Sequence, residues 1–418
     1  MRCRLEFCLV FGCLLVGCQA EEGRERADRS AQASAEQLVR VADAPLWEEG
    51  EAWRVQPDPL LSIGDVEGDD PYLLPSVQGA LRVQDGRILV LARGAERRIR
   101  VFDEEGRHME SWGGAGDGPG EFGLPPWGLH PTPEGGGILV PEAMAERVSR
   151  FGLDGRFQER TTLRYERQRQ HWDRVRAESC CAFREVLPDG SWLVAYPDEA
   201  PIEGDGIRRG EQVLVRFSSD GEWLGEFARV RGRLWRPGTS SDPGPLMYVP
   251  LTAYLATAVV GGEVFVSSGI EYRVDVFDLE GTPLRTLRMD REPPAFDGEI
   301  REAFLQNVRR SLEQSRGERE VRRRLSSIET ALPARIAAFS DLLADPEANL
   351  LLVSPAIPGA DDRSRTAVVL DSRGRLLGDL TLPTGLRPLQ VGHDWILGVT
   401  EDDMGVNRVV LHRVRKPR

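Results

Sequence analysis

An apolar strand that ends in a glycine-bearing turn recurs five times along this chain of 418 residues. The copies span residues 98 to 106, 147 to 155, 213 to 221, 272 to 281 and 367 to 374. In each copy an Asp- or Ser-bearing turn follows the strand, and we expect a positive φ at the glycine that ends it, namely Gly106, Gly155, Gly221, Gly281 and Gly374. Such a repeat predicts a fold built from one unit placed many times.

A second element, a turn followed by an apolar strand, precedes each copy. These strands end at Val90, Val140, Val194, Val266 and Val353. From the end of each such strand to the end of the next, the separations are 12, 11, 23, 11 and 17 residues. The short separations leave room for a hairpin turn but not for a helix, so neighbouring strands must be antiparallel.

A sixth unit, formed by residues 394–399 and 408–411, lies so close to the last residue that its outermost strand is missing. Near the other end, Leu60–Gly64 has the pattern of an outer strand with no unit of its own. Pairing this spare strand with the deficient unit closes a ring and leaves no open sheet edge there. We therefore predict an all-β fold, a six-bladed β-propeller closed by an N-terminal strand.

One inter-blade connection carries a sharper motif, Gly-Gly-Ala-Gly-Asp-Gly-Pro-Gly-Glu-Phe at residues 113–122. It resembles the Gly-x-Gly-Pro-Gly-Glu-Phe connection of NHL-like six-bladed β-propellers, which include many exported bacterial lipoproteins. Residues 64–71 are a degraded version, and the resemblance in organisation covers roughly residues 50 to 418. It implies the propeller fold but says little about function, because propellers host many unrelated activities.

The first residues predict export. Arg2 and Arg4 precede a largely apolar run from Leu5 to Gly17, which is the layout of a secretory signal peptide over residues 1–17. The sequence Leu-Val-Gly-Cys that ends at Cys18 resembles the lipobox of bacterial lipoproteins, which implies lipidation of Cys18 and membrane anchoring through that lipid. By the rules of that family, Gln19 favours the outer membrane in a host that has one. The alternative is an ordinary signal peptide cut elsewhere.

Residues 18–50 are polar, with few large apolar side chains, and we expect a flexible tether there. The propeller then occupies residues 51–418. Within it, apolar residues at helical spacing between about 298 and 332 predict two amphipathic helices that are broken near Gly317. This helical insertion either packs on the rim of the propeller or serves as a lid over the channel or a docking surface.

The net charge of −13 repels polyphosphate, so we do not expect nucleic acid as a partner. After loss of the signal peptide and lipidation of Cys18, Cys180 and Cys181 are the cysteines that remain. This adjacent pair could form a vicinal disulfide, bond to other chains, or pack as small apolar residues. Two cysteines make a poor zinc site, since structural sites need four ligands.

No catalytic constellation, metal site or cofactor motif is visible in the sequence. The five histidines, at positions 108, 130, 171, 393 and 412, stand singly, and no Gly-x-Ser-x-Gly motif occurs. Candidate ligand contacts are the aromatic residues predicted near inter-blade loops, Trp127, Trp235, Tyr248 and Tyr254.

We therefore expect a lipid-anchored binding or scaffold module for a protein, peptide or glycan of the cell envelope. The alternative is a metal-assisted hydrolase or lyase with its site at the channel mouth, because residues of separate blades converge there only in three dimensions.

Overall fold

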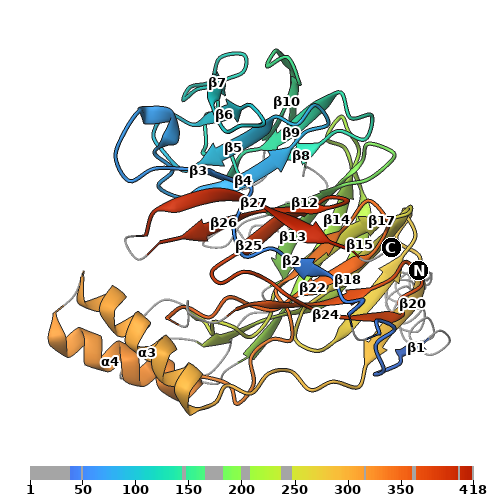
Figure 1. The fold of residues 1–418 in the computed structure, drawn as a ribbon, viewed down its shortest axis with the longest axis vertical. Helices are drawn as coiled ribbons and strands as arrows, with labels where there is room; N and C mark the ends of the chain where they lie inside the picture. The colour runs from blue at the N-terminus through green and yellow to red at the C-terminus, as the bar shows by residue number, and fades with distance from the viewer. Residues whose placement is uncertain are drawn as a thin grey trace, which may run out of the picture.

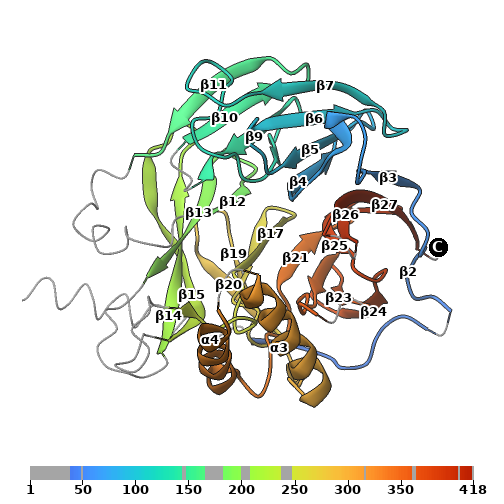
Figure 2. The same cartoon turned by 90° about the vertical axis from the view of Figure 1, so that its left-hand side faces the viewer.

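A computed structural model describes residues 38–48, 50–143, 147–164, 182–198, 208–236, 247–314, 317–359, 364–402 and 405–416. These residues form six sheets arranged around a central axis, as Figure 2 shows, and the consecutive strands of each blade are antiparallel. The fold is the predicted six-bladed β-propeller with a small helical insertion. The first strand of each blade lies innermost, and these six strands surround the central channel.

The first three blades follow one another along the chain. Blade 1 consists of β4 (Val77–Arg82), β5 (Ile88–Ala92), β6 (Arg98–Phe102) and β7 (His108–Gly113). Blade 2 consists of β8 (His130–Pro131), β9 (Gly137–Pro141), β10 (Arg147–Gly152) and β11 (Phe157–Thr162). Blade 3 has five strands, β12 (Ala182–Val186), β13 (Trp192–Asp198), β14 (Arg208–Phe217), β15 (Trp223–Arg236) and β16 (Met247–Tyr248).

The last three blades complete the ring. Blade 4 consists of β17 (Ala256–Val260), β18 (Glu263–Ser267), β19 (Arg273–Phe277) and β20 (Pro283–Met289). Blade 5 consists of β21 (Asp341–Ala344), β22 (Leu350–Val353), β23 (Thr366–Leu370) and β24 (Leu376–Thr381). Blade 6 contains β25 (Arg387–Val391), β26 (Trp395–Glu401) and β27 (Asn407–Arg415). The predicted strands and their antiparallel pairing are confirmed.

The hydrophobic core lies between the blades, with a cluster of buried side chains at every junction. In β5, Ile88 and Val90 face blade 6, whereas Leu89 and Leu91 face blade 2. Successive side chains of a strand point to opposite faces of its sheet. Because both faces of each blade are covered, the central strands are apolar throughout, which explains why they are uninterrupted apolar runs in the sequence.

The repeated glycines have the predicted positive φ and mark the contact between one blade and the next. Values of φ are +81° at Gly106, +77° at Gly155, +85° at Gly221, +88° at Gly281 and +77° at Gly374. A Cβ atom at Gly155 would lie 2.3 Å from Nε1 of Trp112, on the outer strand of blade 1. At Gly374 it would lie 2.7 Å from Leu287, on the outer strand of blade 4. Each turn therefore fits against the preceding blade only when it carries glycine.

The ring closes through an N-terminal strand, as predicted. Strand β3 (Leu61–Ile63) pairs antiparallel with β27, with Ile63 opposite Val409, and supplies the missing outer strand of blade 6. Ile63 is buried in the cluster between blades 6 and 1. Leu61 and Ile63 also pack on Gly106, so this strand meets blade 1 as the outer strand of any other blade would.

The structure corrects the C-terminal part of the prediction that residues 18–50 form a flexible tether, because residues 38–48 are attached to the blades. Strand β1 (Leu38–Val41) pairs parallel with β20 and extends blade 4. The amides of Leu46 and Trp47 donate to carbonyls of β24 at 3.0 and 2.9 Å. The outer edges of these blades supply hydrogen-bond partners that a polar segment lacks on its own, and Val41 is buried against blade 4. Residues 18–37 lie outside the described residues.

The helical insertion between blades 4 and 5 consists of α3 (Gly298–Glu313) and α4 (Glu318–Ala331), with Gly317 as the N-cap of α4. Both helices and the break between them are as predicted. Their apolar sides enclose Phe304 with Phe296, Leu251 and Ile336, which belong to the connections between blades. Figure 1 places the helices at one end of the ring and β1 at the opposite side.

The glycine contacts generate a stability prediction. Gly155→Ala should lower the free energy of unfolding by about 2–4 kcal/mol, because it combines an unfavourable positive φ with overpacking against Trp112. The control Gly190→Ala has the same kind of φ, +83°, but no atom within 4 Å of the added carbon. It should cost about 1 kcal/mol. Urea unfolding measures both losses, and equal losses would contradict the proposed blade contact.

Candidate functional site

The end of the ring that carries α3 and α4 also carries the connections between blades, and we call it the top face (Figures 1 and 2). Two clusters of charged side chains lie on it. One surrounds a cavity at the outer part of blade 4, and the other lies where the inner strands of blades 3, 5 and 6 meet the channel.

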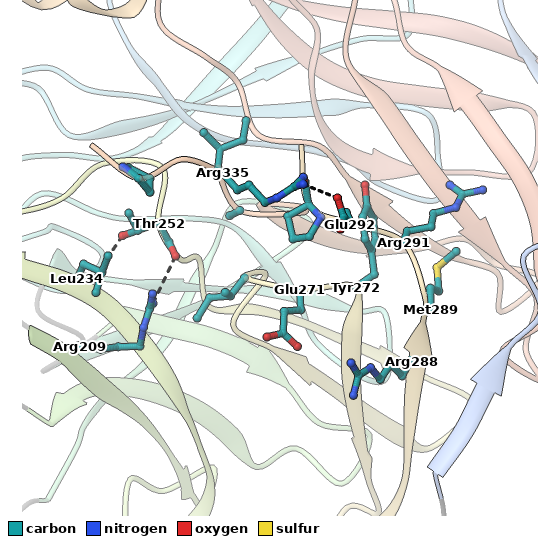
Figure 3. A pocket seen from close by; sticks show the side chains of 15 residues that line it. Arg209, Leu234, Thr252, Glu271, Tyr272, Arg288, Met289, Arg291, Glu292 and Arg335 are labelled. Carbon is teal, nitrogen blue, oxygen red and sulfur yellow. Dashed lines mark hydrogen bonds and ion pairs between the residues drawn. The ribbon is translucent and has the colours of Figure 1, made fainter. Parts of the chain in front are cut away.

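The cavity, which we call the rim pocket, has a volume of about 360 Å³. Five segments form it: the start of β14, the end of β15 with the connection after β16, the β18–β19 turn, the end of β20 with the residues that follow it, and the chain returning from α4. Figure 3 shows its lining residues: Arg209, Leu234, Thr252, Ile270, Glu271, Tyr272, Arg288, Met289, Arg291, Glu292, Pro293, Pro333, Arg335, Ile336 and Ala337. The helical insertion therefore completes a pocket rather than merely covering a rim.

The lining of the rim pocket combines apolar side chains with an excess of positive charge. Ile270, Met289 and Ile336 are among its apolar members. Its charged members are four arginines and two glutamates. Burial raises the pKa of the Tyr272 phenol, which therefore stays protonated and able to donate a hydrogen bond at neutral pH.

Several arginines of the rim pocket are held by the fold. Arg335 donates to the carbonyl of Pro293 at 2.6 Å and pairs with Glu292, as Figure 3 shows. Arg291 pairs with Asp379 of blade 5 at 2.7 Å. Arg209 donates to the carbonyl of Gly232 at 2.9 Å. Arg288 is exposed and has no side-chain hydrogen bond or ion pair with the described residues, so its guanidinium is available to a ligand.

The second group, which we call the channel cluster, consists of Arg184, Glu185, Asp341, Arg365 and Arg387. The ladder between β12 and β13 shifts register between Phe183 and Glu185, so Arg184 occupies a bulge of the inner strand. Asp341 begins the inner strand β21, Arg387 begins β25, and Arg365 directly precedes β23. Burial lowers the pKa of all three arginines, and the charge of Asp341 opposes that shift in each.

Glu185 of the channel cluster and the nearby His130 have shifted pKa values. Burial raises the pKa of Glu185 to about 7, although the Thr257 hydroxyl donates to its Oε1 at 2.7 Å. Burial, together with the charge of Arg184, lowers the pKa of His130 to about 4, so its imidazole is uncharged at neutral pH. At neutral pH, Arg184 therefore has an uncharged imidazole and a partly protonated carboxyl near it.

Of the aromatic residues proposed from the sequence, Trp127 and Tyr254 lie in connections between strands, whereas Trp235 and Tyr248 lie in strands. Trp127 precedes β8 and is 48% exposed. Trp235 of β15 lies opposite Tyr248 of β16 in the ladder. Tyr254 is half-buried against the core of the helical insertion. None of these four belongs to the lining of the rim pocket.

The cysteines proposed from the sequence, Cys18, Cys180 and Cys181, lie outside the described residues. The charged residues of both clusters are not among those that the sequence patterns indicate. The adjacent charged residues Arg184 and Glu185 are a weak signal of a site, because they interrupt the apolar residues that precede a turn between two strands.

The described residues contain no group of three His, Cys, Asp or Glu side chains placed to hold a metal ion. None of the helices in the described ranges has the length and apolar character needed to cross a membrane.

No family model matches this chain, and no curated protein matches it in sequence. Among solved structures, a Bacteroides vulgatus member of the DUF4221 family is 9% identical, with 88% of this chain and 99% of that chain covered and a TM-score of 0.48. A Bacteroides fragilis protein assigned as exported is 12% identical, with coverages of 91% and 99% and a TM-score of 0.47. The calcium-binding protein regucalcin from Agrobacterium tumefaciens is 10% identical, with coverages of 84% and 94% and a TM-score of 0.40. At these identities the likeness concerns the fold alone.

Glu185 generates a prediction about pH. Its pKa is raised from 4.5 to about 7 in the folded protein, so the fold favours the protonated carboxyl. The corresponding stabilisation is complete below pH 4.5 and is lost as the pH rises through 7. Between pH 5 and pH 8 the wild type should therefore lose about 2 kcal/mol of unfolding free energy that Glu185→Gln does not lose.

Urea unfolding of both proteins at the two pH values measures this difference. Glu280→Gln, on the exposed β19–β20 turn, is a matched control that should keep the wild-type pH dependence. Parallel behaviour of the wild type and Glu185→Gln would show that Glu185 does not titrate in this range.

Proposed function

We propose that this protein is an exported, lipid-anchored binding module of the cell envelope, and that its ligand is a peptide segment with acidic groups. The ligand occupies the rim pocket. The observation that carries the proposal is the composition of this pocket, in which four arginines and two glutamates surround an apolar floor in a chain whose net charge is −13. The function is binding rather than catalysis.

The chemistry of the pocket favours a peptide over a neutral glycan. Apolar side chains such as Ile270, Met289 and Ile336 provide contacts for aliphatic or aromatic side chains. Guanidinium groups form charge-assisted, often bidentate hydrogen bonds with carboxylates. A sugar is bound chiefly through hydrogen-bonding polar groups and stacking on aromatic rings, and among the described lining residues Tyr272 alone is aromatic. An acidic peptide uses both parts of the pocket.

The placement of the chain ends is compatible with anchoring through Cys18. Figure 1 places β1 at the side of the ring remote from α3 and α4. The twenty residues from Cys18 to Leu38 span at most roughly 65–70 Å when extended. An anchor at Cys18 therefore leaves the top face, with its rim pocket, accessible to a partner in the envelope.

A peptide selection tests the binding site. The purified full-length protein in detergent should enrich peptides with Asp, Glu or a free C-terminal carboxylate from a random library. Enriched peptides should bind about tenfold more weakly to Arg288→Glu, because the variant replaces an available guanidinium with a like charge. Isothermal titration calorimetry measures the affinities.

Arg54→Glu is the matched control. It makes the same change in net charge at an exposed arginine of β2 (Arg54–Val55), which pairs with β27 and does not line the rim pocket. Its affinity should equal that of the wild type. Equal losses in the two variants, or enrichment of neutral peptides, would contradict the proposed site.

Anchoring is tested separately. Cys18→Ser should move the protein from the membrane fraction to the soluble fraction and abolish metabolic labelling with radioactive palmitate, because the proposed lipid is attached to this thiol. Unchanged labelling would place the lipid elsewhere. Unlabelled wild-type protein would support the ordinary signal peptide instead.

A further inference from the structure

We infer that the channel cluster is a second binding site, specific for a small oxyanion, in which Arg184, Arg365 and Arg387 hold the anion at the top of the central channel. This site is separate from the rim pocket and does not rest on the proposed peptide ligand.

Three blades contribute cations to the channel cluster. Arg184 comes from blade 3, Arg365 from blade 5 and Arg387 from blade 6, and each of them interacts electrostatically with the carboxylate of Asp341. Arg387 also lowers the pKa of Arg365, which shows that these two guanidiniums repel one another. Arginine does not deprotonate in proteins, so the repulsion persists at every physiological pH.

Two buried donors of the cluster lack a partner among the described residues. Arg365 is 8% exposed; its Nε donates to the carbonyl of Ser354 at 2.9 Å and its Nη2 to the Ser340 hydroxyl at 3.1 Å. Its Nη1 has no partner, and neither has Nε of Arg184. A buried donor left unsatisfied is costly, especially on a charged group. An oxyanion would accept from both.

Among the described groups that act on one another here, the carboxyl groups do not fully balance the arginines. Arg184, Arg365 and Arg387 stand opposite Asp341, Glu401, which acts on Arg387, and Glu185. Because Glu185 is partly protonated near pH 7, these three positive charges face fewer than three full negative charges. The excess is positive and attracts an anion.

Solvent reaches the cluster, since 48% of the Asp341 side chain is exposed. A small anion can therefore enter from the top face. Guanidinium groups match the geometry of an oxyanion, with two parallel hydrogen bonds to two oxygens. A spherical halide offers no such pair of acceptors, so the site should distinguish an oxyanion from chloride.

Sulfate is a suitable probe because it keeps the same charge between pH 6 and pH 8. We expect calorimetric titration of the full-length protein in detergent, at ionic strength held constant with chloride, to show one saturable sulfate site at pH 6. Arg365→Gln should weaken it by about tenfold or more. Arg184→Gln should weaken sulfate binding by a similar factor, and among the described residues it removes no side-chain hydrogen bond of the fold. It therefore tests the site even where Arg365→Gln fails to fold.

Two further variants separate this site from others. Arg335→Gln changes the rim pocket alone and should leave sulfate affinity unchanged; loss of binding in this variant would assign the anion to the rim pocket and overturn the inference. Sulfate should bind the wild type more weakly at pH 8, where Glu185 is ionised, and Glu185→Gln should remove that difference. Absence of saturable binding, or wild-type affinity in Arg184→Gln and Arg365→Gln, would also overturn it.

Discussion

The pairing of β3 with β27 is the interaction on which the rest of the structure depends. Without it, the edge of β27 is open at Val409–Leu411 and the cluster between blades 6 and 1 loses Ile63. The closure of the ring is not covalent, because β27 is held to the N-terminal strands by strand hydrogen bonds and packed side chains. Lys416 adds a further tie near the end of the chain, because it pairs with buried Asp345 of blade 5 at 2.6 Å. The channel cluster exists only in the closed ring, since its members come from three blades.

The parts of the fold that could be predicted are those that repeat. In blades 1 to 5, the turn between the third and fourth strands needs glycine where it meets the preceding blade. The second strand of a blade is apolar on both of its faces. The inner strands could not be found in this way. Strand β8 has two residues, and the ladders of β4, β12 and β25 shift register, so no regular alternation marks these four inner strands.

The site residues were missed for a related reason. Asp341 and Arg387 are ordinary charged residues in the sequence, and only the ring brings them to one channel. The rim pocket likewise combines residues on both sides of the helical insertion with parts of blades 3 and 4. The aromatic residues that the sequence indicates do not mark either site. Tyr254, for example, packs against the core of the helical insertion and does not line the rim pocket. An acidic chain thus brings the arginines of these two sites together through topology, not through a basic segment.

Strand β1 has a mechanical consequence. Tension applied to the chain ahead of Leu38 reaches the four-residue parallel pair with β20 before it reaches Trp47, β2 or β3. Pairs of strands resist a pull along their length by loading all their hydrogen bonds together. Detachment of β1 would release chain length while β3 remains in blade 6, so the closure of the ring is shielded from force. Under such tension, the pair of β1 with β20 would therefore separate before the pair of β3 with β27 that closes the propeller.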